Sequence, residues 1–270
     1  MGEVILIDLP YFCCMDNVGV RDLHHFIAEQ LDSNCILEER DDFSLFICPT
    51  LTFDIILLKS FQKLPPPVAE RRRISINEGQ LNYEFEKIKN RLKVLSGKAK
   101  KIYARQTVLA RIDKSQAMEF QQEHHLQVAM PGKYRYGLYL KGELVSIAIF
   151  SGGRKMRNQK DDYRSFELIR FCHKSDYLVI GGISKLIKGF IDDFHPGDIM
   201  TYVDKDWSQD SSLKTIGFEE KGEKAGGEFW VSSGIQYPIS NKTDLKEVIE
   251  NHPHGYLSPY SGSIKLVLAI

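Results

Sequence analysis

Apolar residues recur with two different spacings along this chain, and the change from one spacing to the other falls at a pair of glycines. Residues 165–173 (SFELIRFCH) alternate between apolar and polar side chains, which is typical of a strand. After Gly181 and Gly182, apolar residues recur at helical spacing from Ile183 to Ile191. The pattern therefore predicts a strand, a glycine turn and a helix that begins at the turn.

A helix that begins at a glycine turn offers a binding site for an anion such as a phosphate. The first backbone N–H groups of a helix have no partner within it, and the helix dipole places partial positive charge at the same end. Glycine also allows a ligand to come close to the backbone. The alternative is that the two glycines serve only the packing of the turn.

The other segments predict a mixed α/β chain that is divided into three parts. Residues 1–64 are expected to form a small α+β module of unknown role, and residues 65–100 a proline-containing linker with an amphipathic helix. Residues 101–270 are expected to form a larger α/β domain. Helices are predicted over 21–31, 77–95, 113–125 and 208–215. Strands are predicted over 4–12, 35–38, 43–48, 53–58, 102–112, 134–140, 143–150, 198–203, 228–231 and 264–270.

The charge of the chain is balanced overall but uneven along its length. The formal net charge is zero, which disfavours a dominant nucleic-acid footprint. Residues 1–60 contain 3 Lys or Arg against 11 Asp or Glu, whereas residues 61–105 contain 12 against 4. We expect the two regions to attract each other; the alternative is that the basic one meets an acidic partner. The run Arg71–Arg73 is interpreted as an acid-paired or solvated surface, with a phosphate clamp as the alternative.

The cysteines and the apolar runs give an indication of the cellular compartment of the protein. The five cysteines are Cys13, Cys14, Cys35, Cys48 and Cys172, and no two form a CxxC pair. Their odd number and mostly apolar surroundings predict reduced, buried thiols. No signal peptide is recognised at the N-terminus, and no apolar run is long enough to span a bilayer. We therefore expect a cytoplasmic protein without a membrane partner.

Two blocks of the larger domain resemble the GNAT superfamily of N-acetyltransferases. The first is Val179-Ile-Gly-Gly-Ile-Ser-Lys-Leu186, which stands where that family has a glycine turn whose amides hold the coenzyme A pyrophosphate. The second is residues 206–218 (DWSQDSSLKTIGF), a short helix that closes with Gly-Phe. The resemblance covers about residues 101–270. It implies a mixed central sheet flanked by helices, with acetyl-CoA as co-substrate.

A closer resemblance is to a GNAT-like domain of phage-encoded proteins that are often found beside homing-endonuclease modules. The shared motifs are His125-Leu-Gln127, Glu167-Leu-Ile-Arg-Phe171, the block at 179–186, Tyr202-Val-Asp204 with Trp207-Ser208, Gly217-Phe218 and Gly262-Ser-Ile-Lys265. Residues 1–95 resemble no family, and they carry no endonuclease signature.

The chain also departs from the GNAT pattern. Leu178 replaces the leading Arg or Gln of the turn, and Asp206 replaces the usual Asn. Leu213 replaces the tyrosine that often protonates the leaving thiolate. Cofactor binding by backbone amides tolerates such changes better than acid catalysis does, because amides do not depend on side-chain identity.

The resemblance implies which residues would bind the cofactor. The end of the strand, where backbone groups grip the pantetheine, is Phe171, Cys172 and His173. The turn that holds the pyrophosphate is Ile180, Gly181, Gly182, Ile183, Ser184 and Lys185. Lys185 could add a positive charge near the phosphates, or it could simply face solvent. Cys172 is interpreted as a buried strand cysteine rather than a nucleophile.

Glu167, Asp204 and His125 are the candidates for the base that accepts the proton of the attacking amine. Glu167 lies mid-strand between apolar residues, and its alternative role is an ion pair with Arg170 or another cation. Asp204 ends the following strand, and His125 belongs to the His-Leu-Gln motif. His173 is a weaker candidate, because a histidine at a strand end is commonly exposed.

The acceptor would be bound by Trp207, Ser208 and Arg170. Trp207 stands in a polar loop, where it would wall the acceptor pocket or pack the loop onto the sheet. No metal is expected, since the adjacent His24 and His25 of a predicted helix point in different directions.

Together these features predict an acyl-CoA-dependent N-acyltransferase in which an unidentified amine attacks the thioester directly. The alternative is a catalytically degenerate module with the GNAT fold that binds nucleic acid or a protein. Segment 71–105 would then be its footprint, and steeply salt-dependent binding would be its signature. The sequence does not indicate the acceptor or the oligomeric state.

Overall fold

The chain is described from a computed structural model that covers residues 18–59, 71–157, 159–207 and 211–270. The predicted strand over 4–12, Cys13, Cys14, the proline run at 65–67 and Ser208 lie outside the described residues.

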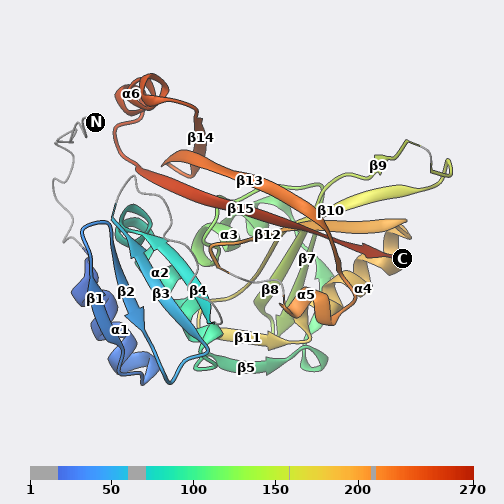
Figure 1. Cartoon of the computed structure of the whole chain (residues 1–270). Coiled ribbons are helices and arrows are strands. Elements are labelled where there is room, and N and C mark those ends of the chain that lie inside the picture. Colours follow the sequence, from blue (N-terminus) through green and yellow to red (C-terminus); the bar gives the residue numbers. More distant parts are fainter. Residues whose placement is uncertain (1–17, 60–70, 158, 208–210) are drawn as a thin grey trace.

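The N-terminal module contains one four-stranded sheet and two helices (Figure 1). The strands are ordered β1-β2-β3-β4, and only β3 and β4 run parallel. The module comprises α1 (Val20–Leu31), β1 (Ile36–Glu39), β2 (Phe43–Ile47), β3 (Phe53–Leu58), β4 (Arg72–Asn77) and α2 (Glu78–Leu95). Apolar residues of both helices share one core with the strands. Residues 72–95, which were expected to lie between two domains, therefore pack as part of this module.

The C-terminal part is built around a nine-stranded mixed sheet. The main strand order is β14-β13-β15-β12-β10-β8-β7-β6, and β9 pairs with β10. Its helices and strands are β5 (Lys100–Tyr103), the 3-10 helix η1 (Ala104–Gln106), β6 (Val108–Arg111), α3 (Lys114–His124), β7 (Tyr134–Leu140), β8 (Glu143–Phe150), β9 (Arg154–Lys155), β10 (Arg164–His173), β11 (Tyr177–Ile180), α4 (Gly182–Phe194), β12 (Asp198–Asp204), α5 (Ser211–Thr215), β13 (Glu219–Ser232), β14 (Ile235–Ile239), α6 (Lys242–Asn251) and β15 (Tyr256–Ala269). This architecture confirms the expected fold class, a mixed central sheet flanked by helices and preceded by a small α+β module.

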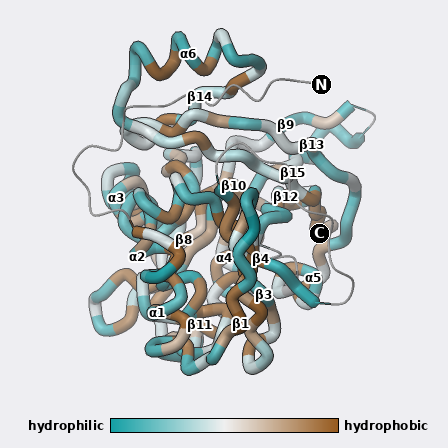
Figure 2. Tube along the Cα trace, turned by 60° about the vertical axis from the view of Figure 1, so that its left-hand side comes forward, coloured by the Kyte–Doolittle hydropathy of each residue, from teal (hydrophilic) through white to brown (hydrophobic). Residues whose placement is uncertain are grey.

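Strand β8 shows how the alternating sequence places helices on both faces of the sheet. Ala148 and Phe150 pack in the same core as α4, whereas Ile147 and Ile149 pack with α3. Successive side chains of a strand point to opposite faces, so one apolar run serves two layers. Figure 2 shows hydrophobic trace concentrated in the middle of the molecule around β8, β10 and α4. The ring of Phe190 on α4 stacks on Phe150 with centroids 4.0 Å apart.

One predicted strand is wrong. The apolar run over 102–112 is divided into β5, η1 and β6. The Lys185 ammonium donates to the carbonyl oxygen of Ala104 at 2.9 Å and to that of Thr107. Strand β5 then pairs with β11 in a separate two-stranded sheet, and β6 pairs with β7 at the edge of the large sheet. The break is therefore fixed by contacts with α4. The apolar pattern of residues 102–112 gives no indication of these contacts, because Lys185 is distant in sequence.

Cys35 and Cys48 form a disulfide, which corrects the expectation that the cysteines are reduced. Strands β1 and β2 are antiparallel, and Ile36 pairs with Ile47. The two cysteines are next in register, so they face each other at one end of the hairpin. Disulfides are rare in the cytosol. The bond weighs against the predicted cytoplasmic location. Cys172 is a free, buried thiol.

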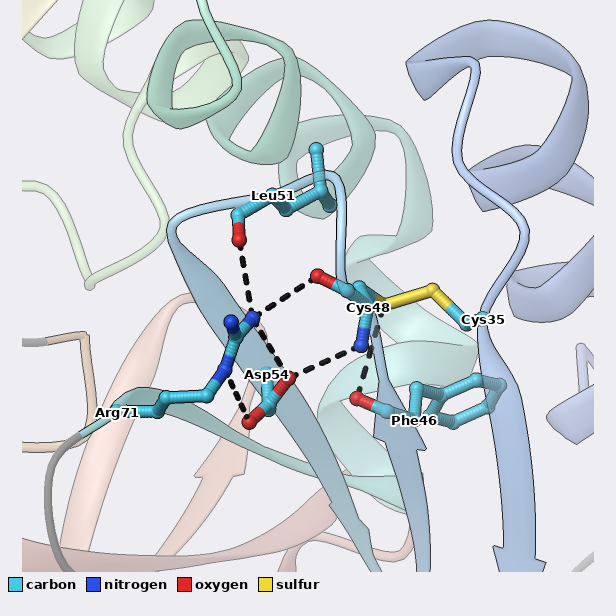
Figure 3. Close-up of polar contacts among 6 residues, drawn as sticks. All are labelled: Cys35, Phe46, Cys48, Leu51, Asp54 and Arg71. Atoms are coloured by element: carbon cyan, nitrogen blue, oxygen red, sulfur yellow. Dashed lines mark hydrogen bonds and ion pairs between the residues drawn. A yellow bond between two sulfur atoms is a disulfide. The ribbon is translucent and has the colours of Figure 1, made fainter.

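The end of this hairpin is tied by a network of hydrogen bonds around Arg71 (Figure 3). The Arg71 guanidinium donates to both carboxylate oxygens of Asp54, at 2.9 and 3.1 Å, and to the carbonyl oxygens of Cys48 and Leu51. The backbone N–H of Cys48 donates to Asp54 at 3.0 Å. Arg71 is therefore paired with an acid, as expected, rather than free to clamp a phosphate.

Candidate active site

Strands β10 and β12 diverge, and their divergence opens the central sheet. They pair in parallel only over Ser165–Glu167 and Asp198–Met200. Immediately beyond, a bulge at Ile169 interrupts the pairing of β10 with β8, and a bulge bends the strand that carries it. The hydroxyl of Thr201 still bridges the two strands at the start of the gap, donating to the carbonyl oxygen of Leu168 at 2.8 Å. Farther along, β10 and β12 form no ladder with each other.

Two cavities meet at this gap. One, of about 570 Å³, runs from the divergence of β10 and β12 to the glycine turn before α4, and we call it the turn cleft. The other, of about 810 Å³, lies between β10, β13, β15 and the start of α2, and we call it the outer cavity. Residues that line both include Gln127, Leu168, Arg170, Asp204 and Trp207. A reaction between ligands in the two cavities would therefore take place beside these residues.

The glycine turn has the backbone form that an anion site needs. Gly181 caps α4 with φ of 75°, a left-handed conformation that favours glycine. The first intrahelical bond runs from the N–H of Lys185 to the carbonyl of Gly181, so the N–H groups of residues 182–184 have no helical acceptor. Gly182 is also tightly packed, because a Cβ there would lie 3.2 Å from Val179 and 3.3 Å from His173. The glycines therefore serve packing as well, the alternative that the sequence left open.

The Lys185 side chain does not reinforce this turn as a free charge. Its ammonium is held by the carbonyl oxygens of Ala104 and Thr107, with the hydroxyl of Thr107 at 3.4 Å. Lys185 is not among the residues that line the turn cleft. Its predicted role beside a phosphate is thus replaced by a structural one, which anchors η1 on α4.

The end of β10 contributes backbone rather than reactive side chains. Burial raises the pKa of the Cys172 thiol to about 12, so Cys172 remains protonated at neutral pH. Burial lowers the pKa of His173 to about 3, with a smaller contribution from Arg91. Its Nδ1 lies 3.0 Å from the hydroxyl of Ser146. Both side chains, and that of Phe171, are at least partly buried, so His173 is not the exposed strand-end histidine of the sequence-based expectation.

Asp204 is the strongest acid–base candidate at the point where the cavities meet. Its carboxylate accepts the backbone N–H of Asp206 at 2.8 Å and the side-chain amide of Gln127 at 3.3 Å. Burial, and then the neighbouring carboxylate of Asp206, raise the pKa of Asp204 to about 7. Burial raises the pKa of Asp206 as well, while the N–H and hydroxyl of Ser261 donate to its carboxylate. Asp204 can therefore exchange a proton near neutral pH.

The His-Leu-Gln motif acts on Asp204 through its glutamine. His125 Nδ1 accepts the backbone N–H of Gln127 at 3.0 Å, which fixes the turn from which the Gln127 amide reaches Asp204. Burial, with a smaller contribution from Arg170, lowers the pKa of His125 to about 3. His125 is thus neutral and already engaged, and it lines the turn cleft but not the outer cavity. Its geometry suits positioning better than catalysis.

Glu167 and Arg170 lie on β10 and line the outer cavity. The Glu167 carboxylate is 4.0 Å from the Arg154 guanidinium, and its backbone N–H donates to the hydroxyl of Ser151 at 2.9 Å. The Arg170 guanidinium donates to the carbonyl oxygen of Val128 at 3.0 and 3.1 Å. Arg170 therefore ties the loop after α3 to the sheet, which leaves less of its guanidinium for a substrate.

Trp207 packs against the N-terminal module rather than against the large sheet, and it also lines the outer cavity. Its ring is 4 % exposed and joins the core of the N-terminal module. The Arg72 guanidinium donates to its carbonyl oxygen at 3.0 Å, and Ser75 donates to that of Asp206 at 2.8 Å. Trp207 thus packs the loop after β12 onto the module, and it lines both cavities. Leu213 lines the turn cleft.

Sequence reasoning missed three contributors to this site. The sequence indicates Gln127 only as part of the His-Leu-Gln motif, and Asp206 only as a replacement for an asparagine. Asp206 could have been found from its spacing, because residues 204 and 206 at a strand end are close enough to couple. Arg91 comes from a helix that is distant in sequence, and the sequence marked it only as part of the basic segment 71–105.

The described ranges offer neither a metal cluster nor a membrane-spanning helix. No group of three or more His, Cys, Asp or Glu residues is placed there to hold a metal ion. No helix within those ranges is long and apolar enough to cross a bilayer.

No protein-family model matches the chain, and no curated protein matches it in sequence. Solved structures with some likeness include the ribosomal-protein-S18-alanine N-acetyltransferase of Escherichia coli, at 14% identity over 61% of this chain and 94% of that one, with a TM-score of 0.39. An IAA acetyltransferase of Bacillus cereus is 12% identical over 61% and 99% of the two chains, with a TM-score of 0.36. A GNAT family acetyltransferase of Elizabethkingia anophelis with acetyl-CoA bound is 9% identical over 61% and 99%, with a TM-score of 0.35. Scores of this size assign neither a fold nor an activity.

Proposed function

We propose that this protein is an acyl-CoA-dependent N-acyltransferase that transfers an acyl group, in the simplest case acetyl, to an amine. Membership of the GNAT superfamily, and the closer resemblance to phage-encoded GNAT-like domains, are parts of the same proposal. The observation that carries it is the continuity of one cleft from the glycine turn, through the gap between β10 and β12, to Asp204.

The turn cleft suits the acyl donor. Its far end offers the N–H groups at the start of α4 to a pyrophosphate. Along the gap, β10 and β12 are not paired beyond residue 167. Their backbone N–H and carbonyl groups there can therefore form hydrogen bonds with the amides of a pantetheine arm. The thioester would then lie near Asp204, where the outer cavity admits the acceptor.

The chemistry follows from a carboxylate whose pKa is about 7. The amine nitrogen attacks the thioester carbonyl, and Asp204 accepts a proton from the nitrogen. The C–S bond then breaks, and the amide and the coenzyme A thiolate are formed. Leu213 offers no proton to that thiolate, so the thiolate takes one from water or from the carboxylic acid that Asp204 has become. The fixed amide of Gln127 keeps the carboxylate in place for the proton transfer.

The test is a calorimetric titration of acetyl-CoA into the wild type and into Ile180→Asp. Ile180 is 39 % exposed and lines the turn cleft next to Gly181, so a carboxylate there repels a pyrophosphate without disturbing the core. Ile235→Asp is the matched control, because Ile235 is 52 % exposed on β14 and lines neither cavity.

We expect wild type and Ile235→Asp to bind acetyl-CoA equally, and Ile180→Asp to bind at least about tenfold more weakly. If the wild type does not bind acetyl-CoA, the proposed function is wrong. Binding that Ile180→Asp leaves unchanged would mean that the donor lies elsewhere.

A further inference from the structure

The N-terminal module forms one wall of the turn cleft. Helix α2 contributes residues from several turns to the lining, together with residues of β10, β11 and the start of α4. The lining residues from α2 are Gln80, Lys87, Asn90, Arg91, Val94 and Leu95. The cleft that suits the acyl donor is therefore incomplete without a module for which the sequence suggests no role.

Arg91 is the cation on this wall whose charge is not taken up by a neighbour. Among the described residues, none forms a hydrogen bond or an ion pair with its guanidinium. By contrast, the Lys87 ammonium is 2.6 Å from Glu84, and Arg170 donates to the carbonyl oxygen of Val128. Lys93, which is also on α2 but lines neither cavity, is 3.0 Å from Asp176. Arg91 alone of these cations keeps its donors for a ligand.

The surroundings of Arg91 make the cleft electropositive. Its positive charge helps to lower the pKa values of His125 and His173 and opposes the rise in the pKa of Cys172. None of these three side chains carries charge at neutral pH. Burial, and then the proximity of Arg72, lower the pKa of Arg91 to about 10, so it remains a cation. A partly buried guanidinium without a carboxylate partner is costly unless an anion joins it.

We propose that Arg91 binds a phosphate group of the acyl donor, so that the N-terminal module completes the donor site. This inference rests on the proposed function. Arg91 lines the turn cleft, which also contains the glycine turn, and is absent from the lining of the outer cavity. An anionic group of the acceptor, which would enter through the outer cavity, fits this position less well. The planar guanidinium also matches two phosphate oxygens at once.

The test is the dissociation constant of coenzyme A at several salt concentrations for wild type, Arg91→Gln, Arg91→Lys and Arg40→Gln. Arg40 is the matched control, since it lies on the same module, its side chain is 65% exposed, and it lines neither cavity. We expect Arg91→Gln to bind about 10- to 100-fold more weakly, with a shallower salt dependence, because one charge-assisted contact is lost. Arg91→Lys should lie between that variant and the wild type, and Arg40→Gln should match the wild type.

Each other outcome has a definite meaning. Failure of the wild type to bind coenzyme A would overturn the proposed function and this inference together. Wild-type binding that Arg91→Gln leaves unchanged would overturn the inference alone. Weaker binding by Arg91→Gln with an unaltered salt dependence would also overturn it, because that result indicates a structural effect. A change only in the KM of an amine acceptor would assign Arg91 to the acceptor instead.

Discussion

Asp204 is the side chain on which the chemistry of this site depends. Its position at a strand end made it a candidate from the sequence, second to Glu167. The structure separates the two. Asp204 lines both cavities, and the carboxylate of Asp206 helps to raise its pKa. Glu167 lines only the outer cavity and lies 4.0 Å from the Arg154 guanidinium. The sequence could not distinguish them, since burial and the approach of Asp206 depend on the whole fold.

Replacing Asp204 with asparagine should remove the base and its pH dependence. The wild-type rate at saturating donor should rise with pH up to about 7, where the carboxylic acid becomes a carboxylate, and then level off. Asp204→Asn should lower kcat by roughly 10²- to 10⁴-fold and lose that rise. The measurement is the pH–rate profile of both proteins. A mutant that keeps the wild-type profile would assign the base to another group, with Glu167 the first to examine.

At the scale of elements, local pattern predicted much of the fold where the apolar spacing was regular. The helices over 21–31, 77–95 and 113–125 and the hairpin around Lys141-Gly142 are confirmed. Strand β4 was not predicted, because it begins with the arginine run, and α6 and β14 were missed in a polar segment. The gap between β10 and β12 could not be predicted, since it arises from a bulge and from pairing with other strands.

The link between α4 and η1 gives a prediction at this scale. Lys185→Met should destabilise the fold by about 1–3 kcal/mol, because the carbonyl oxygens of Ala104 and Thr107 lose a charged donor. Lys188→Met, an exposed lysine one turn farther along α4, is the control and should change stability little. Denaturant unfolding measures both variants. Equal stability of the two would mean that Lys185 does not anchor η1.

At the scale of the whole molecule, the two parts of the chain meet around the site. Trp207 buries its ring in the N-terminal core, and Tyr83 of α2 stacks on Tyr256 of β15 with centroids 5.1 Å apart. The charge asymmetry of the sequence anticipated contacts within the N-terminal part instead, as Arg71 pairs with Asp54 and Lys98 with Asp32. Hydrophobic spacing gave no sign that α2 would line the cleft, because its apolar face packs on its own module.

The most direct test of this arrangement is a crystal structure of the protein with coenzyme A. The predicted result places the pyrophosphate at the N–H groups of residues 182–184, a phosphate within reach of Arg91, and the thiol in the gap between β10 and β12 beside Asp204. Coenzyme A bound outside the turn cleft, or with its thiol remote from Asp204, would contradict the assignment of this cleft as the donor site.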